Sequence, residues 1–166
     1  MKKILLIHGW NYANYTSLGC KNAWENRSKF VESLSKHFNV VTINLPGFCG
    51  QEDPEHPWGL DDFVRYVDKI IEKEKPDHLL GYSFGGAIAL RWKKMTGDMS
   101  IKTFLISPAI IRRYESKDLR LIQKGIKAIL PARAIVALRD FYLTKVVKNP
   151  YYVHATRVMK ETYRNI

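Results

Sequence analysis

The sequence predicts an α/β fold, in which a parallel sheet with helices on both faces is followed by a helical segment. Strand-like apolar runs alternate with amphipathic stretches over the first 107 residues, and no strand-like run appears after Pro108. Proline or glycine marks most of the boundaries between them. The alternating order requires right-handed crossovers, which lay parallel strands side by side and place helices over both faces.

Four strands and three helices are expected within the alternating region. The strands are short apolar runs of the kind that is buried on both faces: Lys3–His8, Val40–Leu45, His78–Tyr82 and Ile101–Ser107. The helices show apolar residues spaced three and four apart: Trp24–Phe38, Leu60–Lys75 and Gly85–Met95. Because ligands of such sheets bind at the carboxyl ends of the strands, the loops that follow the strands are the candidate functional loops.

The last third of the chain is expected to be helical. Three stretches have helical spacing, with Pro131 and Pro150 at the breaks: Leu119–Leu130, Ala132–Val147 and Tyr151–Tyr163. A run of helices after the strands suggests a cap over the sheet edge. We therefore expect two parts, a core over residues 1–110 and a helical cap or lid segment over residues 111–166.

The composition is typical of a globular chain without a membrane span. Of the 166 residues, 46% are hydrophobic and 26% are charged, and no apolar run approaches the roughly 20 residues of a spanning helix. Cys20 and Cys49 form neither a disulfide framework nor a metal-ligand pattern. We interpret both as free thiols in a reducing cytoplasm, and we expect neither a metal nor another cofactor.

The net charge of +11 is unevenly distributed. Residues 1–100 contain 13 Lys and Arg against 12 Asp and Glu, whereas residues 101–166 contain 14 against 4. A basic surface for an anionic ligand is one interpretation. The basic residues are spread around helices rather than clustered. This favours a solvated face, or a face that packs against something acidic, over a nucleic-acid partner.

Residues Gly81–Gly86 connect a strand to a helix and contain Ser83 in the pattern Gly-x-Ser-x-Gly. A serine in such a tight turn projects its hydroxyl from the sheet edge, and the helix N-terminus directs free N–H groups toward developing negative charge. Gly81 and Gly85 avoid clashes across the turn, and Gly86 lets the helix pack closely. The alternative is a glycine-rich connection without chemistry. A phosphate loop is disfavoured because no Gly-Lys-Ser/Thr follows.

Four motifs resemble those of the α/β-hydrolase family, in that family's order and each at a strand end: His8-Gly9-Trp10, Ile43–Phe48, Gly81–Gly86 and Leu105–Ala109. The resemblance covers residues 3–110. It implies an α/β-hydrolase-like sheet and a serine esterase or related acyl hydrolase with Ser83 as its nucleophile. It also implies an oxyanion hole formed by the backbone N–H groups of Trp10 and Phe84, at the nucleophile elbow.

Each of the other motifs has a second interpretation. His8 is better explained as a buried histidine that orients its loop by hydrogen bonding than as a catalytic residue. Trp10 could serve only in packing rather than in an oxyanion hole. Pro46-Gly47 could be only a turn between two elements.

The acid and the histidine that follow the serine in this family are not found in their expected places. His154 is the only histidine after Ser83, and Glu115 and Asp118 follow the fourth strand; none of the three is favoured. The simplest explanation is a truncated chain, either a fragment, a partial gene or a decayed copy. Truncation would leave the fourth strand as an exposed sheet edge through which the chain associates.

Two functions are consistent with these observations. The first is a serine hydrolase that cleaves an ester or related acyl bond of a small-molecule substrate through a Ser83 acyl-enzyme. The second is a non-catalytic hydrolase-fold fragment that binds a ligand or partner.

Overall fold

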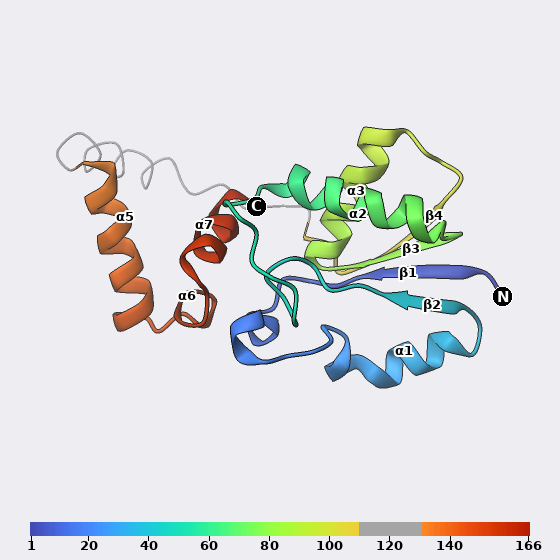
Figure 1. The fold of residues 1–166 in the computed structure, drawn as a ribbon, viewed down its shortest axis with the longest axis horizontal. Helices are drawn as coiled ribbons and strands as arrows, with labels where there is room; N and C mark the ends of the chain where they lie inside the picture. The colour runs from blue at the N-terminus through green and yellow to red at the C-terminus, as the bar shows by residue number, and fades with distance from the viewer. Residues whose placement is uncertain (110–130) are drawn as a thin grey trace. The chain divides into compact units, whose positions relative to one another are not determined.

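The predicted parallel sheet is confirmed in a computed structural model that describes residues 1–109 and 131–166. Four strands pair in parallel in the order β2-β1-β3-β4 (Figure 1). Their bounds are β1 Lys3–Ile7, β2 Asn39–Thr42, β3 His78–Tyr82 and β4 Lys102–Ile106. The register places Leu5 of β1 opposite Val41 of β2 and Leu79 of β3.

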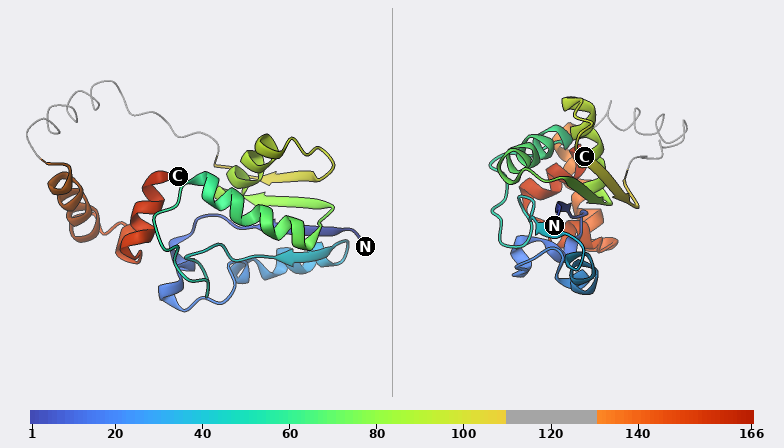
Figure 2. Two further views of the ribbon diagram at one scale, coloured as in Figure 1. Left: turned by 45° about the horizontal axis from the view of Figure 1, so that its top comes forward. Right: turned by 90° about the vertical axis from the view of Figure 1, so that its right-hand side faces the viewer.

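Helices cover both faces of the sheet. In Figures 1 and 2, α2 (Leu60–Glu74) and α3 (Phe84–Thr96) lie on one face, and α1 (Ser28–Ser35) lies on the other. Side chains alternate along each strand, so Leu5 and Ile7 join the core under α2 and α3. Ile4 and Leu6 point the other way, toward Trp24 and the residues of α1. The result is two hydrophobic clusters separated by the sheet.

Two predicted elements are shorter in the structure. The stretch predicted as one helix from Trp24 to Phe38 is a 3-10 turn, η3 (Glu25–Arg27), followed by α1. Buried Trp24 is held by a hydrogen bond from its N–H to the side chain of Asn22, which replaces helical bonding there. Strand β2 stops at Thr42 because the next residues bond elsewhere: the N–H of Leu45 donates to His8 Nε2 over 3.0 Å. Two further 3-10 turns, η1 (Tyr12–Asn14) and η2 (Thr16–Leu18), follow β1.

The chain divides into two compact units, Met1–Ile110 with Ala155–Ile166, and Ile111–His154. The described part of the second unit contains α5 (Ala132–Phe141), a π-helical turn η4 (Tyr142–Val146) and α6 (Pro150–Val153). Helix α7 (Arg157–Asn165) belongs to the first unit. The predicted helix Leu119–Leu130 lies outside the described residues.

The grouping of α7 differs from the predicted segment 111–166, which placed all late helices together. The predicted helix Tyr151–Tyr163 is interrupted between α6 and α7, where the hydroxyl of Thr156 accepts the N–H of Met159 and begins a new helix. The buried side chains of α7, Met159 and Thr162, then join the first unit. The chain therefore returns to the core after His154.

The prediction of two free thiols is wrong, because Cys20 and Cys49 form a disulfide with a Cα–Cα distance of 4.4 Å. The pairing is not visible in the sequence, where the two cysteines are 29 positions apart, because it depends on how the loops after β1 and β2 fold toward each other. The cytoplasmic location, which was argued from free thiols, therefore stays a prediction. Among residues 1–109 and 131–166, no helix is long and apolar enough to cross a membrane.

Candidate active site

Ser83 occupies the turn between β3 and α3 with a backbone conformation of φ 51° and ψ −113°. A serine with positive φ is strained, and such strain persists only where the surroundings hold it. Here the Ser83 N–H donates to the carbonyl of Ile106 over 2.9 Å, which anchors the turn to β4. The Ser83 carbonyl accepts the N–H groups of Gly86 and Ala109, each over 3.0 Å. The turn is thus fixed from β4, from the loop after it and from α3.

Three glycines allow this turn to form. A Cβ on Gly81 would lie 2.6 Å from the Gly85 carbonyl oxygen, and one on Gly86 would lie 2.7 Å from Pro108 Cβ. A Cβ on Gly85 would overlap the carbonyl of Ile7, so the first turn of α3 rests directly on the backbone of β1. The glycines expected at this turn are therefore required by close backbone approach.

The loop after β1 passes directly beside the serine. A Cβ on Gly9 would lie 2.9 Å from Ser83 Cβ, so only a glycine backbone fits there. Trp10 follows, and its ring contacts the ring of Phe84 with centroids 5.6 Å apart. Among the described residues, neither the backbone N–H of Trp10 nor that of Phe84 has an acceptor. Two amide donors without an acceptor, those of Trp10 and Phe84, therefore come directly after Gly9 and Ser83 in the chain.

His8 connects the loop after β1 to the loop after β2. Its Nε2 accepts the N–H of Leu45, so its Nδ1 carries the proton and donates to the Gly9 carbonyl over 2.8 Å. Burial lowers the pKa of His8 to about 4, so the ring is neutral at pH 7. Both ring nitrogens are occupied, which fits the orienting role better than a catalytic one.

Aromatic contacts and the disulfide hold the same two loops together. Buried Tyr15 stacks on buried Phe48 with centroids 5.6 Å apart, and the Trp10 indole N–H donates to the Tyr15 hydroxyl. Phe48 also meets the Trp10 ring at 5.0 Å. Cys49 comes directly after Phe48 and carries the bond to Cys20. The Trp10 side chain thus has a packing role and donates one hydrogen bond. Its backbone N–H stays without an acceptor among the described residues.

Helix α7 contributes contacts that sequence reasoning did not foresee. The Met159 side chain fills the place where a Cβ of Gly47 would be, which explains the glycine of the Pro-Gly turn. Tyr163 contacts the Trp10 ring with centroids 5.4 Å apart, and buried Thr162 accepts the N–H of Trp58 over 3.0 Å. The amphipathic pattern predicted this helix but not the surface that it covers.

A general base is not found beside Ser83 in the part of the chain that the structure describes. There the Ser83 hydroxyl has no hydrogen-bond partner, and His8 is fully engaged. His154 lies in the second unit. Glu115 and Asp118, the two alternative acids, lie outside the described residues. Within residues 1–109 and 131–166, no three His, Cys, Asp or Glu side chains gather in a way that would hold a metal.

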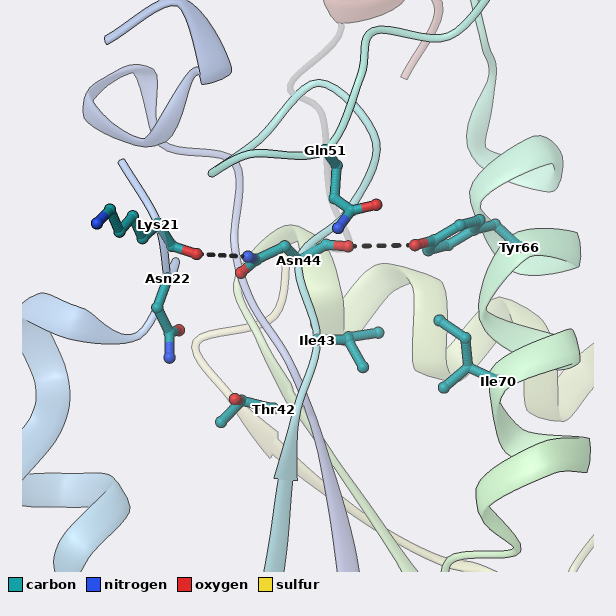
Figure 3. Close-up of a pocket in the computed structure, with 8 residues that line it drawn as sticks. All are labelled: Lys21, Asn22, Thr42, Ile43, Asn44, Gln51, Tyr66 and Ile70. Carbon is teal, nitrogen blue, oxygen red and sulfur yellow. Dashed lines mark hydrogen bonds between the residues drawn. The ribbon is translucent and has the colours of Figure 1, made fainter. Parts of the chain in front are cut away.

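A separate cavity of about 310 Å³ lies at the end of β2 (Figure 3). Tyr66 and Ile70 of α2 line one side, and Lys21 and Gln51 come from the two disulfide-linked loops. Asn44 crosses between these loops by donating to the carbonyls of Lys21 and Cys49 and accepting the N–H of Ala23. No residue of the Ser83 turn lines this cavity, so it is a different feature from the candidate active site.

Comparisons with known proteins agree with this geometry. The family model described as "Alpha/beta hydrolase family" matches residues 4–163. A putative 2-succinyl-6-hydroxy-2,4-cyclohexadiene-1-carboxylate synthase of Haemophilus influenzae is 37% identical over 93 residues, covering 54% of this chain and 33% of that protein. Phospholipase YtpA of Bacillus subtilis is 27% identical over 138 residues, covering 78% of this chain and 49% of that protein.

The fold also matches solved structures. An esterase from Exiguobacterium antarcticum superimposes with a TM-score of 0.57 at 18% identity, covering 99% of this chain and 64% of that one. The chain therefore spans a third to a half of the length of the curated relatives and less than two thirds of the esterase. On the evidence of the sheet, the Ser83 turn and the matched family model, the chain belongs to the alpha/beta hydrolase family.

Proposed function

We propose that the chain carries the nucleophile site of a serine hydrolase that cleaves an ester or related acyl bond of a small molecule. The observation that carries this proposal is the strained Ser83 turn, with φ 51°, in contact with the glycine backbone of the loop after β1. A tight strand-to-helix turn of this kind presents a serine hydroxyl at the top of the sheet. Strain that is held by so many close contacts is typical of functional sites.

In the proposed reaction, Ser83 Oγ attacks the acyl carbonyl carbon and expels the alcohol, which leaves an acyl-enzyme that water hydrolyses. The negative charge that develops on the carbonyl oxygen is stabilised by the N–H groups of Trp10 and Phe84. Both amides lack an acceptor among the described residues, and the α3 N-terminus adds its positive dipole end. The serine proton passes to a general base, which is not among the described residues that surround Ser83.

The names of similar proteins support an ester as the target bond. One relative is named a phospholipase, and one solved structure of the same fold is named an esterase. We propose the small-molecule ester class on this basis. The segment 111–166, predicted as a helical cap, is proposed to select among its members.

A second candidate is a non-catalytic hydrolase-fold chain that binds a ligand. One observation favours it: among the described residues, the Ser83 hydroxyl has no hydrogen-bond partner and His8 is neutral and engaged. A serine without its base loses most of the rate advantage of the triad.

A fluorophosphonate probe separates the two candidates, because it forms a covalent bond only with an activated serine. The proposal predicts labelling of the wild-type chain, labelling of Ser35→Ala as a matched control on exposed α1, and none of Ser83→Ala. Equal labelling of wild type and Ser83→Ala would place the reactive group elsewhere. An unlabelled wild-type chain with its disulfide intact would favour the non-catalytic candidate.

A further inference from the structure

The walls of the cavity at the end of β2 are tied to one another (Figure 3). The side-chain amide of Asn44 donates to the carbonyls of Lys21 and Cys49 over 2.9 and 2.8 Å, so one residue joins the loops after β1 and β2. The disulfide between Cys20 and Cys49 joins the same loops covalently. The Tyr66 hydroxyl donates to the Asn44 carbonyl over 3.3 Å, which adds α2. A cavity built in this way is preformed, so little conformational freedom is lost when a ligand binds.

Three of the lining side chains supply hydrogen-bonding groups that carry no charge. The Thr42 hydroxyl and the Gln51 side-chain amide have no hydrogen-bond partner among the residues that the structure describes. The Asn22 side chain accepts the N–H of Trp24 with its oxygen, which leaves its NH2 group without an acceptor among the same residues. Hydroxyl and amide groups can both donate and accept hydrogen bonds. They therefore suit a ligand that carries several hydroxyl groups.

The described lining residues include a single charged side chain, that of Lys21. Figure 3 shows its ammonium group turned away from the other lining side chains. A site for a carboxylate or a phosphate needs cationic groups aimed at the ligand. The described lining lacks that arrangement, and it contains no carboxylate that would attract a cation. The cavity therefore favours a neutral ligand.

An apolar surface lies beside these polar groups. Ile43 points toward Ile70 of α2, and Tyr66 lies one turn before Ile70 on the same helix (Figure 3). The C–H groups of a sugar ring pack against aromatic and aliphatic side chains, while its hydroxyls reach polar groups at the edge. The volume of about 310 Å³ lies at the small end of ligand sites, which run from about 300 to 1,000 Å³. It fits one sugar ring better than a chain of sugars.

We infer that this cavity binds a single neutral sugar ring of hexose size. The sugar hydroxyls exchange hydrogen bonds with the side chains of Asn22, Thr42 and Gln51. The C–H groups of the sugar ring contact Tyr66 and Ile70. The inference goes beyond the proposed hydrolase function and does not depend on it, because no residue of the Ser83 turn lines the cavity.

A ligand-observed NMR titration of the full chain tests the inference. The neutral probes are glucose, galactose and N-acetylglucosamine, with sorbitol as the open-chain counterpart, and the anionic probes are acetate and methyl phosphate. Thr42→Val and Gln51→Leu each remove a hydrogen-bonding group while keeping the approximate size of the side chain. Thr103→Val is the matched control, because Thr103 is also a partly buried threonine on a strand, but on β4 and outside the cavity lining.

At least one of the three sugars should bind saturably to the wild-type chain and to Thr103→Val. Thr42→Val should weaken that binding by about fivefold, as expected for the loss of one neutral hydrogen bond. The double variant Thr42→Val/Gln51→Leu should weaken it by at least about tenfold. Sorbitol should bind at least about tenfold more weakly than glucose, because an open chain must be ordered on binding. Circular dichroism of the double variant checks that its fold is retained.

Four outcomes would overturn the inference: no saturable binding of any of the three sugars, equal affinity of wild type and the double variant, an equal loss for Thr103→Val and Thr42→Val, or tighter binding of acetate or methyl phosphate than of any sugar. The last would assign the cavity to an anion held by Lys21. Fluorophosphonate labelling of Ser83 is independent of all four, so failure here leaves the proposed hydrolase function standing.

Discussion

The two sides of Ser83 differ in how completely they are built. On the side of β1 and β2, the neighbouring loops are joined by the His8 ring, by the stacked rings of Tyr15 and Phe48, and by the disulfide. On the other side, β4 is the last strand of the sheet among the described residues, and its Phe104, Leu105 and Ile106 are 45%, 37% and 36% exposed. We call the side formed by β1, β2 and the loops after them the closed side, and the side formed by β4 the open side.

This difference separates the parts of the proposed chemistry. The backbone of the Ser83 turn is anchored on both sides, because Gly85 rests on the Ile7 carbonyl of β1 and the Ser83 N–H donates to the Ile106 carbonyl of β4. No general base for Ser83 is found among the described residues of the closed side, because both ring nitrogens of His8 are already engaged in hydrogen bonds. The packed residues of the closed side should therefore tolerate little change, while the exposed side chains of β4 should tolerate substitution and affect association.

The largest effect is expected at the contact between α3 and β1. Gly85→Ala places a methyl group against the carbonyl of Ile7, which is fixed by the sheet on both sides. We expect a loss of about 4 kcal/mol in the free energy of unfolding, together with loss of Ser83 labelling, because the turn must move to relieve the clash. Urea unfolding followed by fluorescence measures the change.

Gly59→Ala is the control for this prediction. A Cβ at Gly59 meets nothing closer than 3.8 Å, and its φ of −104° suits any residue. The loss there should be under about 1 kcal/mol. Similar losses for the two variants would mean that the turn of α3 is not tightly packed on β1.

The disulfide is expected to give the next largest effect. Removing a crosslink that closes a loop of this length costs about 3.5 kcal/mol through the added entropy of the unfolded chain. Unfolding of the wild-type chain with and without dithiothreitol measures the loss directly. The variant Cys20→Ala/Cys49→Ala should match the reduced wild type and show no response to the reductant. An unchanged midpoint for reduced wild type would show that the hydrogen bonds of Asn14 and Asn44 suffice.

A somewhat smaller effect is expected from the pH dependence of His8. Well above pH 6.5 the ring is neutral in both the folded and the unfolded chain, so stability is constant there. Between pH 6.5 and about 4 the unfolded chain binds a proton that the folded chain does not, and stability falls by about 3 kcal/mol in total. Hydrogen bonds from Arg91, from the Gly59 N–H and from Ser100 lower the pKa values of the Asp61, Asp62 and Asp98 carboxyls, so their contributions are lost at more acidic pH than that of His8.

Urea unfolding at pH values from 4 to 7.5 checks this prediction. His8→Gln can still accept the N–H of Leu45 but does not titrate, so its stability should be lower at pH 7 and flat across the window. A slope in the variant equal to that of wild type would assign the titration to another group.

The sequence predicted the closed side well because its signals are local. Strands buried on both faces read as apolar runs, and the Ser83 turn needs glycines at fixed spacing, so both are visible without the fold. The Cys20–Cys49 disulfide was missed because it depends on two loops meeting in space. The packing of α7 was missed for a related reason: an amphipathic helix has the same pattern whichever surface it covers.

The smallest change in stability, and the clearest response of the open side, is expected at β4. An edge strand with exposed apolar side chains pairs readily with a second copy, so we expect concentration-dependent association of the wild-type chain. Leu105→Lys should cost less than about 1 kcal/mol, because the side chain is already exposed, and a charge on an edge strand opposes pairing. Sedimentation velocity should show the variant as monomer where wild type associates, with Lys102→Leu strengthening association as the opposite change. If Leu105→Lys associates like wild type, the contact lies elsewhere, and the open side of Ser83 is not the surface that joins two copies.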